Sequence, residues 1–85
     1  MNTVYYFTAD WCKPCEKVRP IVKELSHDQT VALFQTIDVD DNLDLVSRFS
    51  IRSVPTFIFF EEGIEKRRIT GAQTKEQLED FINGR

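Results

Sequence analysis

The pattern of hydrophobic and polar positions begins with a strand. Residues from Thr3 to Thr8 are β-branched or aromatic without strict alternation, which is typical of a strand covered on both faces. We therefore expect this strand to lie centrally in a sheet. After it, apolar residues recur at helical spacing and predict a helix with one buried stripe. The stripe consists of Cys15, Val18, Ile21, Val22 and Leu25.

The middle of the chain predicts a second strand and a short helix. The strand covers Val31 to Val39, and three residues that favour helix caps follow it: Asp40, Asp41 and Asn42. The inward face of the helix is expected to consist of Leu43, Val46 and Phe49. A right-handed crossover makes the first two strands parallel neighbours.

The last third predicts a hairpin and a final helix. Strands over Thr56 to Phe60 and Ile64 to Thr70 are separated by a Glu-Glu-Gly turn, so they should pair in an antiparallel manner. Thr74 and Gln77 have the spacing of a capping box, and Gly84 is the expected helix stop. The fold class is therefore α/β, in the order βαβαββα around a four-stranded mixed sheet.

The basic run Lys66-Arg67-Arg68 falls on the predicted fourth strand. Because that strand lies at the edge of the sheet, we interpret the three cations as a charged guard against pairing with other chains.

Composition agrees with a packed protein and limits the partners. Hydrophobic residues make up 41% of the 85 residues, and a chain of this length has room for one domain, over residues 1–85. The net charge of −3 offers no field that would gather nucleic acid or an anionic membrane. No run approaches the roughly 18 apolar residues of a membrane span, and the first residues lack the pattern of a secretory signal. We expect a cytoplasmic monomer.

The chemistry concentrates in two cysteines, Cys12 and Cys15. Residues three apart in a helix lie about 5–6 Å apart, which suits a disulfide that opens and closes with little backbone movement. Cys12 lies at the helix start, where free amide groups and the dipole favour a thiolate, and Lys13 adds a cation. Both effects should lower the pKa of the Cys12 thiol and make it the nucleophile. Cys15, one turn further in, is expected to resolve the mixed disulfide.

Two structural interpretations compete with redox chemistry, namely a zinc half-site and a static disulfide. Zinc requires about four ligands, and His27 is the one further Cys or His in the chain, so we expect no metal ligands. A reducing compartment would keep a static disulfide open.

Several segments together resemble the thioredoxin family. They cover almost the whole chain and are Phe7, Ala9, the motif Trp11-Cys12-Lys13-Pro14-Cys15, Pro20, the loop Ile51-Arg52-Ser53-Val54-Pro55-Thr56, and Gly71. Lys13 departs from the glycine that is usual in the family. The family's first strand and helix are absent, which makes the strand Val31 to Val39 an edge of the sheet. Tyr6 stands where the family commonly buries an aspartate near the inner cysteine.

The resemblance implies a three-layer thioredoxin-like fold and a thiol:disulfide oxidoreductase that reduces protein disulfides. It implies no bound cofactor beyond the redox-active Cys12–Cys15 disulfide, with electrons coming from NADPH through a thioredoxin reductase. The expected partners are that reductase and disulfide-containing protein substrates.

The resemblance also assigns roles to residues around the cysteines. Substrates would lie against Trp11, Val54, Pro55 and Gly71. The site would be shaped by Trp11, Lys13, Pro14 and Tyr6, of which Tyr6 offers a neutral phenol in place of a carboxylate. Independently of the family, an X-Pro bond just before a strand favours a cis Val54–Pro55 peptide, and Val54 is placed to pair with an extended substrate.

Two other functions stay open. The short length and Lys13, which could attract a carboxylate of glutathione, are compatible with a glutathione-dependent glutaredoxin-like reductase. A non-enzymatic docking module that uses the same face is the other alternative. Comparing reduction by glutathione with reduction by thioredoxin reductase tests the glutaredoxin-like alternative. Serine variants of both cysteines test the docking module.

Overall fold

The computed structural model describes residues 2–28 and 32–85 and contains four strands and three helices in the expected order. The strands are β1 (Asn2–Thr8), β2 (Leu33–Asp38), β3 (Thr56–Glu61) and β4 (Ile64–Thr70). The helices are α1 (Lys13–Asp28), α2 (Leu43–Arg48) and α3 (Lys75–Asn83). The predicted order βαβαββα is confirmed, while Val31, the expected start of the second strand, lies outside the described residues.

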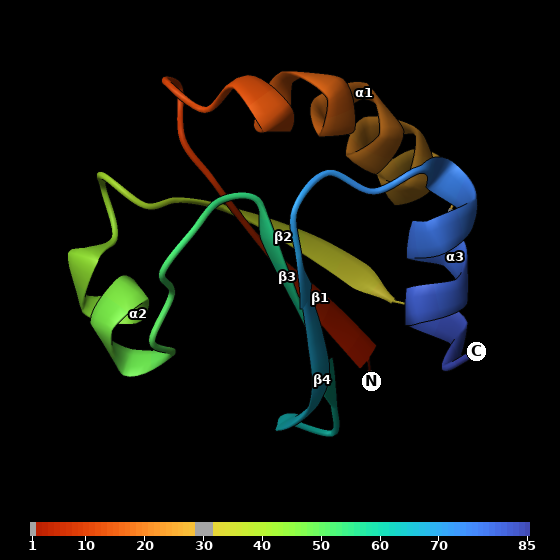
Figure 1. Ribbon diagram of the computed structural model, residues 1–85. Helices are drawn as coiled ribbons and strands as arrows, with labels where there is room; N and C mark the ends of the chain where they lie inside the picture. The colour runs from red at the N-terminus through yellow and green to blue at the C-terminus, as the bar shows by residue number, and fades with distance from the viewer. Residues whose placement is uncertain (1, 29–31) are drawn as a thin grey trace.

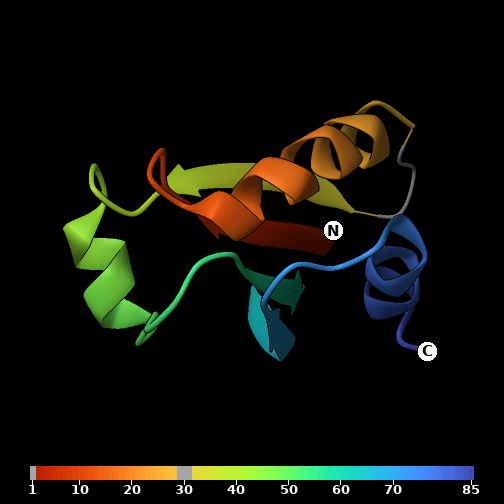
Figure 2. The same cartoon turned by 45° about the horizontal axis from the view of Figure 1, so that its top comes forward.

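The four strands form one mixed sheet in the order β2-β1-β3-β4. β1 pairs parallel with β2 and antiparallel with β3, and β3 pairs antiparallel with β4. The predicted central position of β1 is confirmed, and β2 and β4 are the edges. Helices α1 and α3 cover one face and α2 covers the other, an arrangement visible in Figure 1 and again in Figure 2.

The core has two halves because both faces of β1 are covered. Val4 and Tyr6 belong to the cluster under α1 and α3, whereas Tyr5 and Phe7 belong to the cluster under α2. Successive side chains of a strand point to opposite faces, so a strand with two covered faces is apolar at every position. This explains why the sequence of β1 does not alternate.

Helix α3 is capped at both ends by the residues that the sequence indicated. The Thr74 hydroxyl accepts a hydrogen bond from the Gln77 amide at 3.1 Å, and the Gln77 side chain accepts one from the Thr74 amide at 2.9 Å. Gly84 ends the helix with a φ of 73°, a left-handed conformation that favours glycine. These caps fix the position of α3 against the sheet.

Helix α2 differs from the expectation in its cap and in its inward face. The Asn42 side chain makes no capping bond but donates to the Asp38 carbonyl at 2.9 Å, where it closes the turn after β2. Leu43 is 71% exposed, and the helix instead contacts the sheet cluster through Leu45, with Phe49 following it. A helix advances by 3.6 residues per turn, which rotates Leu43 away from the stripe that Leu45 and Phe49 share. The predicted cap and the inward Leu43 are therefore wrong.

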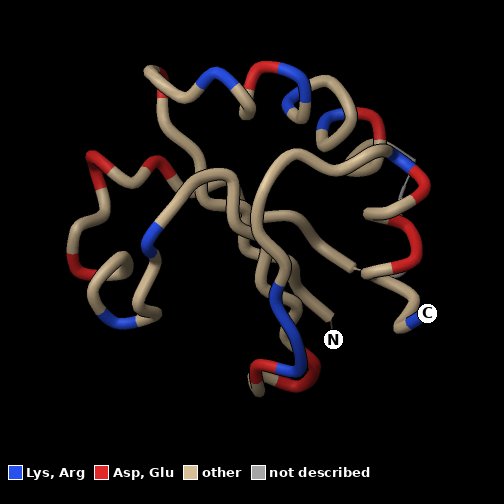
Figure 3. The backbone as a smooth tube through the Cα atoms, viewed as in Figure 1, with Lys and Arg blue, Asp and Glu red and all other residues tan. Residues whose placement is uncertain are grey.

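Charged side chains of both signs are distributed over the molecule. Figure 3 shows acidic residues gathered between the end of β2 and the start of α2, and mixed charges along α1. None of the helices in the described part of the chain is long and apolar enough to cross a membrane.

The interpretation of the basic run on β4 as a guard is wrong for Arg67. Its guanidinium carbon lies 4.2 Å from the ring centroid of Phe59, and its nitrogens donate to the carbonyls of Phe81 and Ile82 at 2.7 and 3.0 Å. Adjacent strand residues face opposite sides, so Arg67 faces α3 while its neighbours face away from it.

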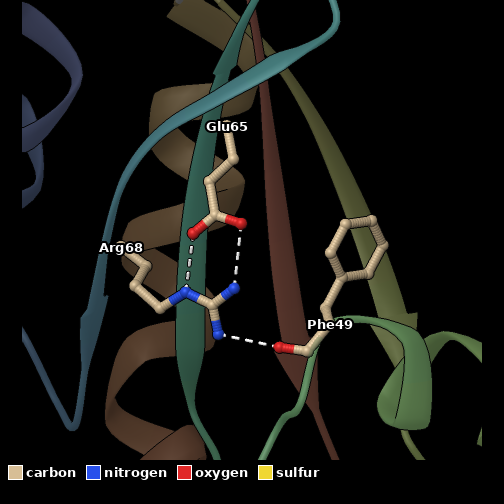
Figure 4. A network of polar contacts seen from close by, with 3 residues as sticks. All are labelled: Phe49, Glu65 and Arg68. Carbon is tan, nitrogen blue, oxygen red and sulfur yellow. Dashed lines mark hydrogen bonds and ion pairs between the residues drawn. The ribbon is translucent and has the colours of Figure 1, made fainter.

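Arg68 points to the α2 side of the sheet and makes a small polar network. Its guanidinium donates to both carboxylate oxygens of Glu65, at 2.7 and 2.9 Å, and to the Phe49 carbonyl at 2.8 Å (Figure 4). The network connects β4 to the residue that ends α2.

Candidate active site

The two cysteines lie at the junction of β1 and α1. Cys12 precedes the first residue of the helix and Cys15 lies in its first turn. They are joined by a disulfide, with their Cα atoms 5.3 Å apart. This separation is within the range that disulfides need and agrees with the helical spacing predicted from the sequence. Both side chains are buried, Cys12 being 3% and Cys15 0% exposed.

Polar backbone groups surround the sulfur of Cys12. The amide of Cys15 donates to the Cys12 sulfur at 3.2 Å, and the carbonyl oxygen of Val54 lies 3.5 Å from the same sulfur. An amide donor in the first turn of a helix stabilises negative charge on sulfur. The Cys15 amide therefore favours a thiolate at Cys12 once the disulfide is reduced, whereas the Val54 carbonyl oxygen can only accept a hydrogen bond from the protonated thiol.

The loop before β3 carries the Val54–Pro55 peptide bond, which is cis as the sequence predicted. Gly71 is connected to this loop, because its amide donates to the Pro55 carbonyl at 2.9 Å. The φ of Gly71 is 90°, a conformation that residues with a side chain rarely adopt. Within residues 2–28 and 32–85, the peptide groups of Val54 make no hydrogen bond to another backbone group. They are therefore available to an extended peptide.

Trp11 forms the exposed rim of the site. Its side chain is 66% exposed, and its indole N–H donates to a carboxylate oxygen of Asp40 at 2.9 Å. Sequence reasoning assigned Asp40 to a helix cap and missed this contact. The signal was available in the topology, because β1 and β2 are parallel and the residues that follow their carboxyl ends meet at one edge of the sheet.

A cavity of about 170 Å³ lies beside Trp11. Its walls come from Trp11, Val39, Val46 and the stretch Ile51–Val54, of which the sequence analysis had assigned Trp11 and Val54 to substrate binding. The walls are largely apolar, so the cavity suits a hydrophobic side chain next to the disulfide.

Lys13 and Pro14 occupy the first turn of α1 and face outward. The Lys13 side chain is 90% exposed, and its ammonium lies 3.8 Å from the Glu16 carboxylate. Solvent screening and this neighbour weaken its effect on the sulfur of Cys12. Pro14 is the second residue of α1, where the missing amide hydrogen costs nothing.

Tyr6 is not part of the cluster that holds the cysteines. It is 2% exposed, its ring stacks on Phe57 with centroids 5.1 Å apart, and its hydroxyl donates to the Thr8 hydroxyl at 3.2 Å. Cys12 and Cys15 instead pack with Ala9. Among the predicted site residues, the structure thus brings Trp11, Val54, Pro55 and Gly71 together with the cysteines and leaves Tyr6 in the core.

Comparison with known proteins agrees with this geometry. The family model described as Thioredoxin matches residues 1–84. The chain is 34% identical to a thioredoxin from Mycoplasma genitalium over 82 residues, which is 96% of this chain and 80% of that protein. It is 39% identical to human thioredoxin over 77 residues, which is 91% of this chain and 72% of that protein.

Solved structures give the same result. A mutant thioredoxin from Halobacterium salinarum superimposes with a TM-score of 0.90 at 37% identity, over 98% of this chain and 73% of that one. A thioredoxin from Nicotiana alata superimposes with a TM-score of 0.90 at 35% identity, over 98% of this chain and 71% of that one. With the Cys12–Cys15 disulfide at the start of α1, the protein is a thiol:disulfide oxidoreductase that reduces protein disulfides. The chain belongs to the thioredoxin family.

Proposed function

We propose that Cys12 attacks the substrate disulfide and that Cys15 resolves the resulting mixed disulfide. The observation that carries this assignment is the 3.2 Å hydrogen bond from the Cys15 amide to the Cys12 sulfur, which favours a thiolate at Cys12 and not at Cys15. Cys15 is fully buried against Ala9, whereas Cys12 borders the rim formed by exposed Trp11.

The proposed reaction consists of two thiol–disulfide exchanges. Cys12 first loses its proton, its thiolate then forms a bond to one substrate sulfur, the substrate S–S bond breaks, and the leaving substrate thiolate takes up a proton. The Cys15 sulfur, after losing its proton, then bonds to the Cys12 sulfur and releases the second substrate thiolate, which is protonated in turn. Two electrons and two protons pass from the cysteine pair to the substrate, and the Cys12–Cys15 disulfide remains.

Substrates are proposed to bind as extended segments across the loop before β3. The peptide groups of Val54, which make no hydrogen bond to another backbone group in the described residues, would pair with the substrate backbone, as in strand addition. Trp11 and the cavity beside it would receive an apolar side chain, while Pro55 and Gly71 form the floor that their hydrogen bond holds in place. The recognised chemistry is therefore an extended peptide with a disulfide and an adjacent apolar residue.

The proposed electron donor is a thioredoxin reductase that uses NADPH, in a reducing cytoplasm, and no bound cofactor is required. Membership of the thioredoxin family supports this donor. Glutathione is the alternative, and one of the two features that suggested it, the Lys13 ammonium, lies 3.8 Å from a carboxylate of its own helix. Oxidation of NADPH by a thioredoxin reductase should depend on this protein, whereas exclusive turnover with glutathione would reject the proposed donor.

Serine variants test the roles of the two cysteines. Cys15→Ser should accumulate a mixed disulfide with a substrate protein through Cys12, because the resolving sulfur is absent, and Cys12→Ser should accumulate none. Turnover should fall by at least about 100-fold in both. The adducts are measured by mass spectrometry without reductant. Adducts that form on Cys15 would reverse the assignment, and full biological activity of the double variant would indicate a docking module instead.

A further inference from the structure

Arg19 places a cation behind the active site. It lies one helical turn after Cys15 on α1, and residues four apart share one side of a helix. Its side chain is half-buried, and its guanidinium Nη2 donates to the carbonyl of Ala9 at 2.7 Å. Among residues 2–28 and 32–85, no carboxylate forms an ion pair with Arg19.

The Ala9 carbonyl connects this cation to the cysteines. It accepts a second hydrogen bond from the amide of Cys12 at 3.2 Å. Ala9 is completely buried and packs against both Cys12 and Cys15. The guanidinium and the Cys12 amide therefore bind the same carbonyl, which connects Arg19 to the turn that leads into Cys12.

With the exception of Asp38, the other charged residues near the cysteines are more exposed to water than Arg19. The charged residues on the adjoining segments are Asp10, Lys13, Glu16, Lys17, Asp38, Asp40, Asp41 and Arg52, and Lys23 and His27 line the same cavity as Arg19. All are exposed except Asp38, which is half-buried and whose carboxylate accepts a hydrogen bond from the Asp40 amide at 2.8 Å. Tyr6, the nearest titratable group of β1, donates its hydroxyl to Thr8. Exposed charges are screened, whereas a partly buried cation acts more strongly on a nearby thiolate.

We propose that Arg19 is a positioning residue for disulfide exchange, which fixes the Ala9–Cys12 turn and supplies a permanent positive charge that stabilises the thiolate of the reduced cysteine pair. An arginine keeps its proton at every pH at which proteins are folded, so the charge does not depend on the redox state. The disulfide carries no charge, and the cation therefore acts on the reduced form alone. Arg19 has no contact with substrate in this proposal and acts through Ala9.

The proposal predicts an effect that depends on pH. Reduction of the disulfide takes up two electrons and two protons. Well below the thiol pKa both protons stay on sulfur, and a nearby cation has no thiolate to stabilise. Above that pKa the thiolate is present, and the cation favours the reduced form. A purely structural role would change the equilibrium by the same factor at every pH.

The test is the redox equilibrium of the full chain with dithiothreitol, from about pH 6 to about pH 10, a range that brackets the ordinary thiol pKa. The oxidised fraction is measured by alkylation and mass spectrometry, and the properties of dithiothreitol cancel between variants. Arg19→Gln should make the protein harder to reduce by about threefold at the alkaline end, which is about 14 mV, and should match the wild type at the acid end. The pH midpoint for alkylation of Cys12 should rise in parallel.

Two further variants separate charge from shape. Arg19→Lys keeps the charge without the guanidinium fork and should stay closer to the wild type than Arg19→Gln at the alkaline end. Lys23→Gln removes a charge one turn further along α1, from the same cavity that Arg19 lines, and should leave the equilibrium unchanged. The proposal is overturned if Arg19→Gln equals the wild type at all pH values, if its shift is the same at all pH values, or if Lys23→Gln has an equal effect. If Arg19→Gln does not fold, Arg19→Met replaces it as the neutral variant. The proposal is then overturned if Arg19→Lys is as hard to reduce as Arg19→Met.

Discussion

The guanidinium of Arg67 connects β4 to the end of α3. It lies over the ring of Phe59 and 5.6 Å from the ring centroid of Phe81, and it donates to the carbonyls of Phe81 and Ile82. Those carbonyls are in the last turn of α3, where few amides remain to satisfy them, the Phe81 carbonyl also accepting a hydrogen bond from the Gly84 amide at 3.4 Å. A cation at this place also interacts favourably with the negative end of the helix dipole. One side chain thus combines aromatic contact, hydrogen bonding and electrostatics.

Replacing this residue should destabilise the fold. Arg67→Met keeps the apolar stem but removes the two hydrogen bonds and the cation–π contact, so we expect a loss of about 2 kcal/mol in the free energy of unfolding. For a domain of this size the loss corresponds to roughly 10 °C in Tm. Urea unfolding measures it, with the outward-facing Lys66→Met as the matched control. Equal stability of the two variants would show that the contacts of Arg67 contribute nothing.

Tyr6 allows a second test at the residue scale. We predict that its phenol does not carry a proton in the reaction, because it is hydrogen-bonded to Thr8 and grouped with the core. Tyr6→Phe should cost about 1 kcal/mol of stability, the contribution of one buried hydrogen bond, and should leave turnover within a few fold. Steady-state kinetics check the second part. A loss of about 100-fold in turnover would identify Tyr6 as a general acid or base.

At the scale of elements, hydrophobic pattern and caps were sufficient for most of the fold. The apolar run of β1 predicted a covered central strand, and the Thr74 capping box predicted the start of α3. Two of the failures share one cause, namely that a residue type fits two local roles and tertiary contacts decide between them. Asn42 can cap a helix or close a turn, and Arg67 can guard an edge or reach back to a helix.

The site shows the same division between local and tertiary information. The cysteine motif and the Val54–Pro55 loop could be predicted from local sequence patterns. The contact of Asp40 with Trp11 requires the predicted parallel pairing of β1 and β2 in addition to the local pattern, and the contact of Arg19 with Ala9 depends on how β1 and α1 meet in space. The sequence gives the chemical type of each residue, whereas the packing of distant segments decides which residue its side chain contacts.

The Glu65–Arg68 pair belongs to the element scale, because it connects β4 to the end of α2 (Figure 4). The hydrogen bonds from Arg68 hold the pKa of the Glu65 carboxyl below its ordinary value. A carboxyl whose pKa is lower in the folded state stabilises the fold above the ordinary pKa of about 4.3, and this contribution disappears as the pH falls through the folded value.

The predicted consequence is a small acid-sensitive part of the stability. Both side chains are 35% exposed, so solvent screening limits the contribution to about 0.5 kcal/mol. Glu65→Gln should lose this amount at neutral pH and should match the wild type near pH 3, in urea titrations at both pH values. Glu61→Gln, whose partner Lys66 is 3.9 Å away, is the control and should have a smaller effect. A Glu65→Gln effect that is as large in acid as at neutral pH would contradict the role of the carboxylate charge.

At the scale of the whole molecule, the redox state and the stability of the fold are linked. The disulfide closes a loop between residues only three apart in sequence, which removes roughly 2 kcal/mol of conformational entropy from the unfolded chain. In the folded state the helix already holds Cys12 and Cys15 with their Cα atoms 5.3 Å apart, so bond formation costs little order there. Folding and disulfide formation must therefore favour each other by the same free energy.

The oxidised protein should consequently be more stable than the reduced one by about 2 kcal/mol, with a Tm roughly 10 °C higher. Because folding and disulfide formation are linked in one thermodynamic cycle, the equilibrium constant for forming the disulfide should be about 30-fold larger in the folded chain than in the unfolded chain. Differential scanning calorimetry with and without dithiothreitol measures the first quantity, and redox equilibria in water and in concentrated urea measure the second. The Cys15→Ser variant has no disulfide to lose and should have the same Tm in both buffers. Coincident unfolding curves from circular dichroism and from Trp11 fluorescence would also support the expectation that residues 1–85 form a single domain. Equal stability of the reduced and the oxidised protein would contradict this prediction. New contacts in the reduced site would then have to offset the stabilisation that the disulfide gives by constraining the unfolded chain. The predicted 30-fold ratio would be absent as well.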